Sequence, residues 1–72
     1  MTPNEAYTKA KEETGTDFTS CFEMDKYYLF GTEELINLFS VNKDNGDVRV
    51  FNPIYDCTSI EFAKKTVIKD FR

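Results

Sequence analysis

Histidine and tryptophan are missing from this sequence, and cysteine, proline and glycine are scarce, with two, two and three copies among 72 residues. Without histidine, the chain lacks the commonest general base near neutral pH and the commonest zinc ligand. Two cysteines are too few for a disulfide scaffold, and a zinc site would need two carboxylates beside them. The glycines are dispersed, so no glycine-rich phosphate cradle is present. We therefore expect no enzyme activity, no catalytic residue, no metal and no cofactor.

Long apolar runs are also missing. No stretch approaches the roughly 20 apolar residues that cross a membrane. The first residues, Met1 to Tyr7, have neither a basic region nor an apolar run, so we expect no signal peptide. We expect a cytoplasmic protein without a membrane partner and with free thiols. A bridge between Cys21 and Cys57 is geometrically possible but is not implied by the sequence, and that alternative stays open.

Aromatic and acidic residues are plentiful by comparison. Seven Phe and four Tyr make up 15% of the chain, enough to build one modest core over residues 1–72. The formal net charge is −4, and it is uneven: residues 1–57 carry −6, whereas residues 58–72 carry +2. An acidic body argues against a nucleic-acid partner, because neutralising phosphates needs clustered basic residues. We interpret the basic end as a charge match to the last turn of a helix.

The stretch around Asn45-Gly46 predicts a β-hairpin. Both residues tolerate positive φ, and alternating segments flank them at Leu38–Val41 and Val48–Phe51. Similar alternation precedes this hairpin. Thr32 could instead cap a short helix within this region, and that alternative stays open. The predicted strands are residues 17–23, 26–31, 35–43 and 47–52.

Two capping boxes predict helices at the two ends of the chain. Thr2 with Glu5 starts a helix that should run to about Thr14, with Gly15 as its stop. Thr58 with Glu61 starts a second helix over residues 59–70, which places Ile60, Ala63, Val67 and Phe71 on one stripe. The predicted fold class is α+β, with an N-terminal helix, a four-stranded antiparallel meander sheet and a C-terminal helix.

The central strands are apolar on both faces, which is unusual for a sheet with helices on one side. If both helices cover one face, an apolar set remains on the other face and forms a partner-binding surface. Alternatively, the helices cover opposite faces, or a β-bulge rotates part of a strand. On the first interpretation we expect Leu29→Asp and Leu38→Asp to leave folding intact. The partner-binding set is Tyr27, Leu29, Ile36, Leu38 and Phe51.

The first 51 residues resemble a PepSY-type domain. The motifs are the Ala6 and Ala10 spacing followed by Gly15, the aromatic segment Tyr28–Phe30, and the turn from Val41 to Val48. The resemblance implies a helix followed by three strands and a non-catalytic role in binding or inhibiting peptidases. The chain departs from the family by its additional C-terminal helix and its lack of a secretion signal.

Together, these patterns predict a non-catalytic protein-binding module, such as an inhibitor, immunity or regulatory protein. It would act through the apolar sheet face or an exposed edge strand, and its acidic body would attract a basic partner. The alternative is a homodimeric structural protein that buries the same sheet face against its own copy.

Overall fold

The computed structural model describes residues 1–33 and 36–72, and the side chain of Ile36 lies outside the described part. The chain begins with α1 (Pro3–Thr14). The predicted capping box is confirmed, because the Glu5 amide donates to the Thr2 hydroxyl at 3.2 Å and the Thr2 amide donates to the Glu5 carboxylate at 2.8 Å. Gly15 ends the helix as predicted, in the left-handed conformation at φ 71°.

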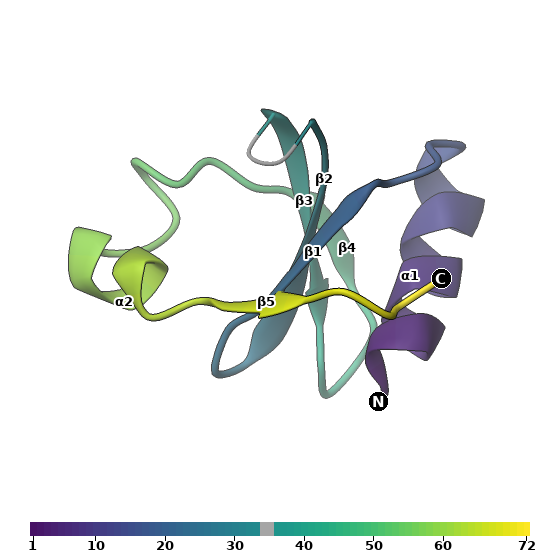
Figure 1. Cartoon of the computed structure of the whole chain (residues 1–72), viewed down its shortest axis with the longest axis horizontal. Coiled ribbons are helices and arrows are strands. Elements are labelled where there is room, and N and C mark those ends of the chain that lie inside the picture. Colours follow the sequence, from purple (N-terminus) through teal and green to yellow (C-terminus); the bar gives the residue numbers. More distant parts are fainter. Residues whose placement is uncertain (34–35) are drawn as a thin grey trace.

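Five antiparallel strands form one sheet in the spatial order β4-β3-β2-β1-β5 (Figure 1). The first four strands follow one another as neighbours, which confirms the predicted meander. The fifth strand was not predicted, and it pairs with β1. The strands are β1 (Ser20–Glu23), β2 (Tyr27–Thr32), β3 (Ile36–Asn42), β4 (Val48–Val50) and β5 (Thr66–Ile68).

The hairpin between β3 and β4 turns at the predicted place, although Gly46 and not Asn45 takes a positive φ. Gly46 takes a φ of 73°, and its amide donates to the carbonyl oxygen of Asn42 at 2.8 Å. The Asn42 side chain accepts a further hydrogen bond from the amide of Asp44 at 2.8 Å. This turn sets the register in which Val41 pairs with Val48.

A register shift interrupts the pairing of β2 with β3. Phe30 pairs with Phe39, but Thr32 pairs with Ile36, and Asn37 takes a positive φ of 52°. The bulge that the sequence left open as an alternative is therefore present. Thr32 ends β2, and the alternative of a short helix after it concerns residues 34 and 35, which lie outside the described residues.

The predicted helix over residues 59–70 is wrong beyond its first turn. The capping box at Thr58 is present, but α2 (Ser59–Ala63) has only five residues, and β5 follows it. The reason lies in Thr66-Val67-Ile68, three consecutive β-branched residues whose side chains favour a strand. The expected apolar stripe does not form, because Ile60 and Val67 are 68% and 59% exposed.

Two apolar clusters lie on opposite faces of the sheet. In Figure 1, α1 lies on one side of the sheet, and residues 52–65, which we call the arm and which include α2, lie on the other. The cluster on the α1 face contains Ala6, Tyr7, Ala10, Phe18, Cys21, Tyr28, Phe30, Val41 and Phe71. The cluster on the arm face contains Phe22, Met24, Leu29, Leu38 and Phe51, with Tyr27, Cys57 and Phe62 packed against it.

After β5, the end of the chain returns to α1. The ring of Phe71 meets those of Tyr7 and Phe30, with centroids 5.4 and 5.7 Å apart. The side-chain amide of Asn4 donates to the Phe71 carbonyl oxygen at 3.2 Å. Within residues 1–33 and 36–72, no helix has the length and apolar content that crossing a bilayer demands.

Candidate functional site

Four members of the predicted partner-binding set lie on one face of the sheet, as the alternation indicated, but most of them are not exposed; they are Tyr27, Leu29, Leu38 and Phe51. Leu29, Leu38 and Phe51 have exposed fractions of 0%, 3% and 7%. Tyr27 is half-buried, with its ring 5.5 Å from that of Phe51. The expectation of an exposed apolar face at these residues is therefore wrong, and the side chain of Ile36 lies outside the described residues.

The arm covers this face. Phe62 from α2 and Cys57 from the preceding loop pack against the cluster that contains Leu29 and Leu38. The arm has no long repeating pattern of apolar residues, because its loop and its five-residue helix each contribute one side chain to the cluster. A pattern search for amphipathic elements therefore misses this cover.

The two thiols lie in different clusters and in settings that disfavour the thiolate. Burial raises the pKa of Cys21 to about 12, and the Glu23 carboxylate adds to this shift. Burial and the carboxylates of Glu61 and Asp56 raise the pKa of Cys57. Both groups therefore stay protonated near neutral pH, and neither is an activated nucleophile.

Several carboxylates are already used by the fold. Glu5 and Glu61 complete the two capping boxes, and Asp17 accepts hydrogen bonds from the Tyr7 hydroxyl and from Arg72. These hydrogen bonds lower the pKa of each of the three carboxyl groups. Among the described residues, no three Cys, Asp or Glu side chains gather as a metal site would need.

The most distinctive surface lies along β5, the outer strand of the sheet beside β1. Val67 pairs with Phe22, so both side chains lie on the arm face, yet Val67 is 59% exposed while Phe22 is 7% exposed. The arm covers this face over β2 and β3 but leaves Val67 open. An open groove of about 520 Å³ runs along this strand, and we call it the β5 groove; its lining includes Phe22, Lys65, Val67 and Lys69.

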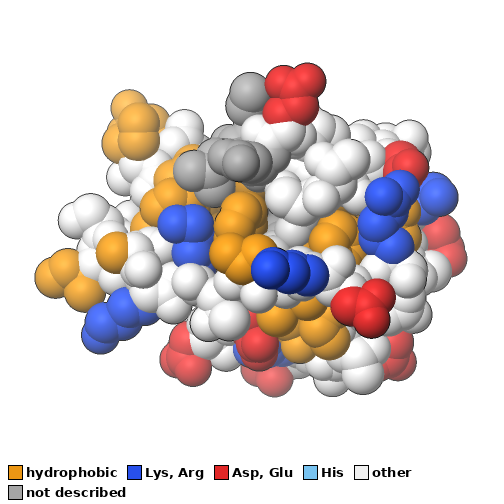
Figure 2. Space-filling view, in the orientation of Figure 1, with side chains coloured by type: hydrophobic (Ala, Val, Ile, Leu, Met, Phe, Trp, Pro, Cys, Tyr) orange, Lys and Arg blue, Asp and Glu red, His pale blue; other side chains and the backbone are white. Residues whose placement is uncertain are grey.

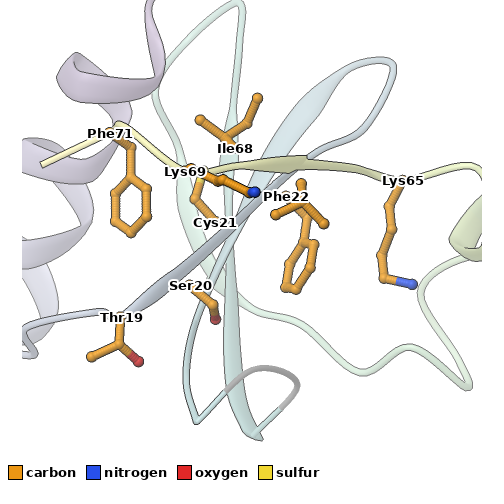
Figure 3. Close-up of a pocket in the computed structure, with 9 residues that line it drawn as sticks. Thr19, Ser20, Cys21, Phe22, Lys65, Ile68, Lys69 and Phe71 are labelled. Atoms are coloured by element: carbon orange, nitrogen blue, oxygen red, sulfur yellow. The ribbon is translucent and has the colours of Figure 1, made fainter.

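Two lysines border the floor of the β5 groove. Figure 3 shows Lys65 and Lys69 on either side of Phe22. The ammonium of Lys65 lies 4.2 Å from the ring centroid of Phe62 and 5.7 Å from that of Phe22, and it donates to the Phe62 carbonyl oxygen at 3.3 Å. Figure 2 shows basic side chains on both sides of an apolar surface over β5. The groove thus combines an apolar floor with positive charge.

The lysines that border the β5 groove belong to the basic end of the chain. The basic end of the chain was interpreted as a charge match to the last helical turn. Since α2 ends at Ala63 without a basic residue in its last turn, Lys65 and Lys69 flank β5 instead. Thr66, Val67 and Ile68 favour a strand, but the helical spacing of apolar residues from Ile60 to Phe71 conceals this signal in the sequence.

Other large apolar side chains are exposed outside the groove. Val50 on the opposite edge strand, β4, is 75% exposed. On the arm, Ile54, Tyr55 and Ile60 are 80%, 83% and 68% exposed. The arm lies on the side of the sheet away from α1 (Figure 1), and neither apolar cluster includes Ile54, Tyr55 or Ile60.

No family model, no curated protein and no solved structure matches this chain. The geometry of the chain itself is therefore the basis for the functional argument.

Proposed function

We propose that this chain is a non-catalytic protein-binding module, such as an inhibitor, immunity or regulatory protein, that engages its partner along the β5 edge. One observation carries the proposal: Val67 is 59% exposed on an outer strand, directly beside the buried ring of Phe22. Contiguous exposed apolar area marks protein-binding surfaces, and Val67 is continuous with the other apolar side chains that line the β5 groove.

An outer strand also offers main-chain groups to a partner. Because β1 is the only described strand that pairs with β5, the other edge of β5 can accept an extended segment through backbone hydrogen bonds. Such hydrogen bonds supply affinity, and neighbouring side-chain pockets supply specificity. The β5 groove provides a pocket of this kind at Val67.

The chemistry of the chain supports a binding role without catalysis. The chain has no histidine, both thiols are held in their protonated form, and three carboxylates are engaged in capping boxes or in the hydrogen bonds of Asp17. If the resemblance to PepSY domains holds, the partner is a peptidase.

A homodimer that buries the same sheet face has less support. Leu29 and Leu38 already lie beneath the arm, so residues 52–65 would have to leave before a second copy could pack there. The oligomeric state stays a prediction, and light scattering measures it directly.

The test uses matched substitutions on the two outer strands. The immobilised chain captures partners from a lysate of its source cells, and Val67→Asp is compared with Val50→Asp. Both side chains are exposed, so both variants should fold. We expect Val67→Asp to lose the captured protein, because the partner would have to bury a carboxylate, and Val50→Asp to retain it. Equal capture by both variants contradicts the proposal.

A further inference from the structure

We propose that the β5 groove binds an extended acidic segment in which one apolar residue stands between two carboxylates, in the pattern acidic–x–apolar–x–acidic. This inference rests on the proposed function and adds the chemistry of the ligand. It is carried by the order of side chains along β5 and by the charge around them.

The first step is the periodicity of the strand. Val67 is the central residue of β5, and Lys65 and Lys69 lie one residue before and one residue after this strand, so each is two positions from Val67. All three line the β5 groove, together with Phe22. Along the chain, the lining of the groove at this edge therefore has the order positive, apolar, positive.

The second step is the charge that remains available. Neither Lys65 nor Lys69 forms a salt bridge with a carboxylate in the described part of the chain, whereas Lys9, Lys43, Arg49 and Arg72 each do. The ammonium of Lys65 lies over the rings of Phe62 and Phe22, and these cation–π contacts hold it beside the groove. Residues 58–72 carry +2 on a protein whose net charge is −4, so this surface is locally basic.

The third step is the pairing that an added strand would make. A segment that joins the free edge of β5 places its same-face side chains opposite Lys65, Val67 and Lys69. Opposite charges stabilise such cross-strand pairs, and an apolar residue pairs best with Val67 over the Phe22 ring. The complementary segment therefore has acidic, apolar and acidic residues at alternating positions.

The same arrangement disfavours a second copy of this chain. In an antiparallel β5–β5 pair centred on Val67, Lys65 of each copy would face Lys69 of the other, and a parallel pair would also oppose lysines. Like charges directly opposite each other are destabilising, and lysines on an outer strand commonly prevent self-pairing. The lysines at this edge therefore disfavour pairing between two copies of β5 and favour an acidic segment.

The experiment titrates the ¹⁵N-labelled full chain with two synthetic peptides and follows the amide resonances. The acidic probe is acetyl-Ser-Thr-Glu-Thr-Val-Thr-Glu-Thr-Ser-amide, and the basic probe has Lys in place of both Glu. We expect the acidic probe to shift the amides of Thr66–Ile68 and Phe22 and to bind about tenfold more tightly than the basic probe. Added salt should reduce this difference.

A charge-reversed variant sharpens the result. Lys65→Glu combined with Lys69→Glu should reverse the preference of the two probes. The matched control, Lys9→Glu with Lys11→Glu on α1, makes the same change in net charge away from the groove and should leave the preference intact. The comparison of the two probes on the unsubstituted chain stands even if the reversed variant does not fold.

The outcomes separate this inference from the proposed function. Equal shifts of the β5 amides by both probes overturn the acidic preference and leave edge binding standing. If neither probe shifts the β5 amides, the acidic preference and binding of extended segments at this edge are both overturned. Binding of the acidic probe at other amides also overturns the inference.

Discussion

The two faces of the sheet are covered in different ways. The α1 face is sealed by a twelve-residue helix that is capped at both ends, and Ala6 and Ala10 reach it without any exposed surface. The arm face is covered by a loop and a five-residue helix of which no residue is buried. One face of this small sheet is therefore covered by a closely packed helix, and the other face by a loop and a short helix with few buried contacts.

The aromatic contacts follow the same division. On the α1 face, the rings of Phe18, Phe30, Phe71 and Tyr7 form a connected set, with centroids 5.4–6.1 Å apart. On the arm face, Tyr27 and Phe51 form the corresponding pair at 5.5 Å, and Phe62 remains half-exposed. Few buried contacts mean a low local opening free energy, so we expect the arm to open before α1 does.

The largest expected effect tests whether the arm face is a core at all. Leu29→Asp places a carboxylate where the exposed fraction is 0%, and we expect a loss of more than about 4 kcal/mol in the free energy of unfolding, comparable to the whole stability of a small domain. Circular dichroism during urea unfolding measures it. This replaces the expectation that Leu29→Asp leaves folding intact.

The control for that substitution is Val50→Asp, at a side chain that is 75% exposed. It should change the free energy of unfolding by no more than about 0.5 kcal/mol. A folded, stable Leu29→Asp variant would mean that the arm does not seal this face.

A smaller effect is expected from removing the N-cap hydroxyl of α1 or of α2, and it should differ between the two helices. Thr2→Ala and Thr58→Ala each remove the hydroxyl of a capping box, which costs about 1 kcal/mol of helix stability. In Thr2→Ala we expect the free energy of global unfolding to fall by this amount, because α1 opens only when the core unfolds. In Thr58→Ala we expect loss of amide protection within residues 52–65 alone, with little change in global unfolding.

Urea unfolding combined with amide hydrogen exchange distinguishes these results. A global loss in Thr58→Ala as large as that in Thr2→Ala would show that the arm and α1 unfold as one unit.

The smallest expected effect is the loss of stability at low pH as two carboxyl groups become protonated. A hydrogen bond from Tyr7 chiefly lowers the pKa of Asp17 on the α1 side, and the backbone amide of Thr58 chiefly lowers that of Glu61 on the arm. Because these pKa values are lowered in the folded state, their stabilisation is present above the unfolded pKa and is lost as the pH falls through the folded pKa.

We therefore expect the free energy of unfolding to decline between about pH 5 and pH 2. Protonation of Asp17 should lower global stability, whereas protonation of Glu61 should lower the local stability of the arm. Carboxyl ¹³C chemical shifts measured against pH report each group separately. Ordinary pKa values at both groups would contradict this expectation, and Asp17→Asn should remove the Asp17 part while leaving that of Glu61.

Local signals explain what the sequence could predict. The boxes at Thr2 and Thr58, the stop at Gly15 and the turn at Asn45-Gly46 act within a few residues, and the structure has all of them. Alternation also assigned Leu29 and Leu38 to one face and Phe30 and Val41 to the other, as the two clusters show.

The features that the sequence could not predict depend on contacts between residues far apart in the chain. The strand at Thr66–Ile68 forms by pairing with β1, far away in the sequence, while the apolar spacing from Ile60 to Phe71 imitates a helix. The cover over Leu29 and Leu38 depends on where an irregular loop returns, and no periodic pattern encodes that. The β5 groove follows from both features, so the sequence alone did not reveal it.

The placement of the two thiols has a consequence for redox behaviour. Cys21 and Cys57 belong to clusters on opposite faces, so the sheet itself keeps them apart. No intramolecular disulfide can tie this fold, and its stability should be the same with and without a reductant. A disulfide formed on oxidation would join two molecules through the more accessible Cys57, which makes reductant a simple means of telling covalent dimers from noncovalent self-association.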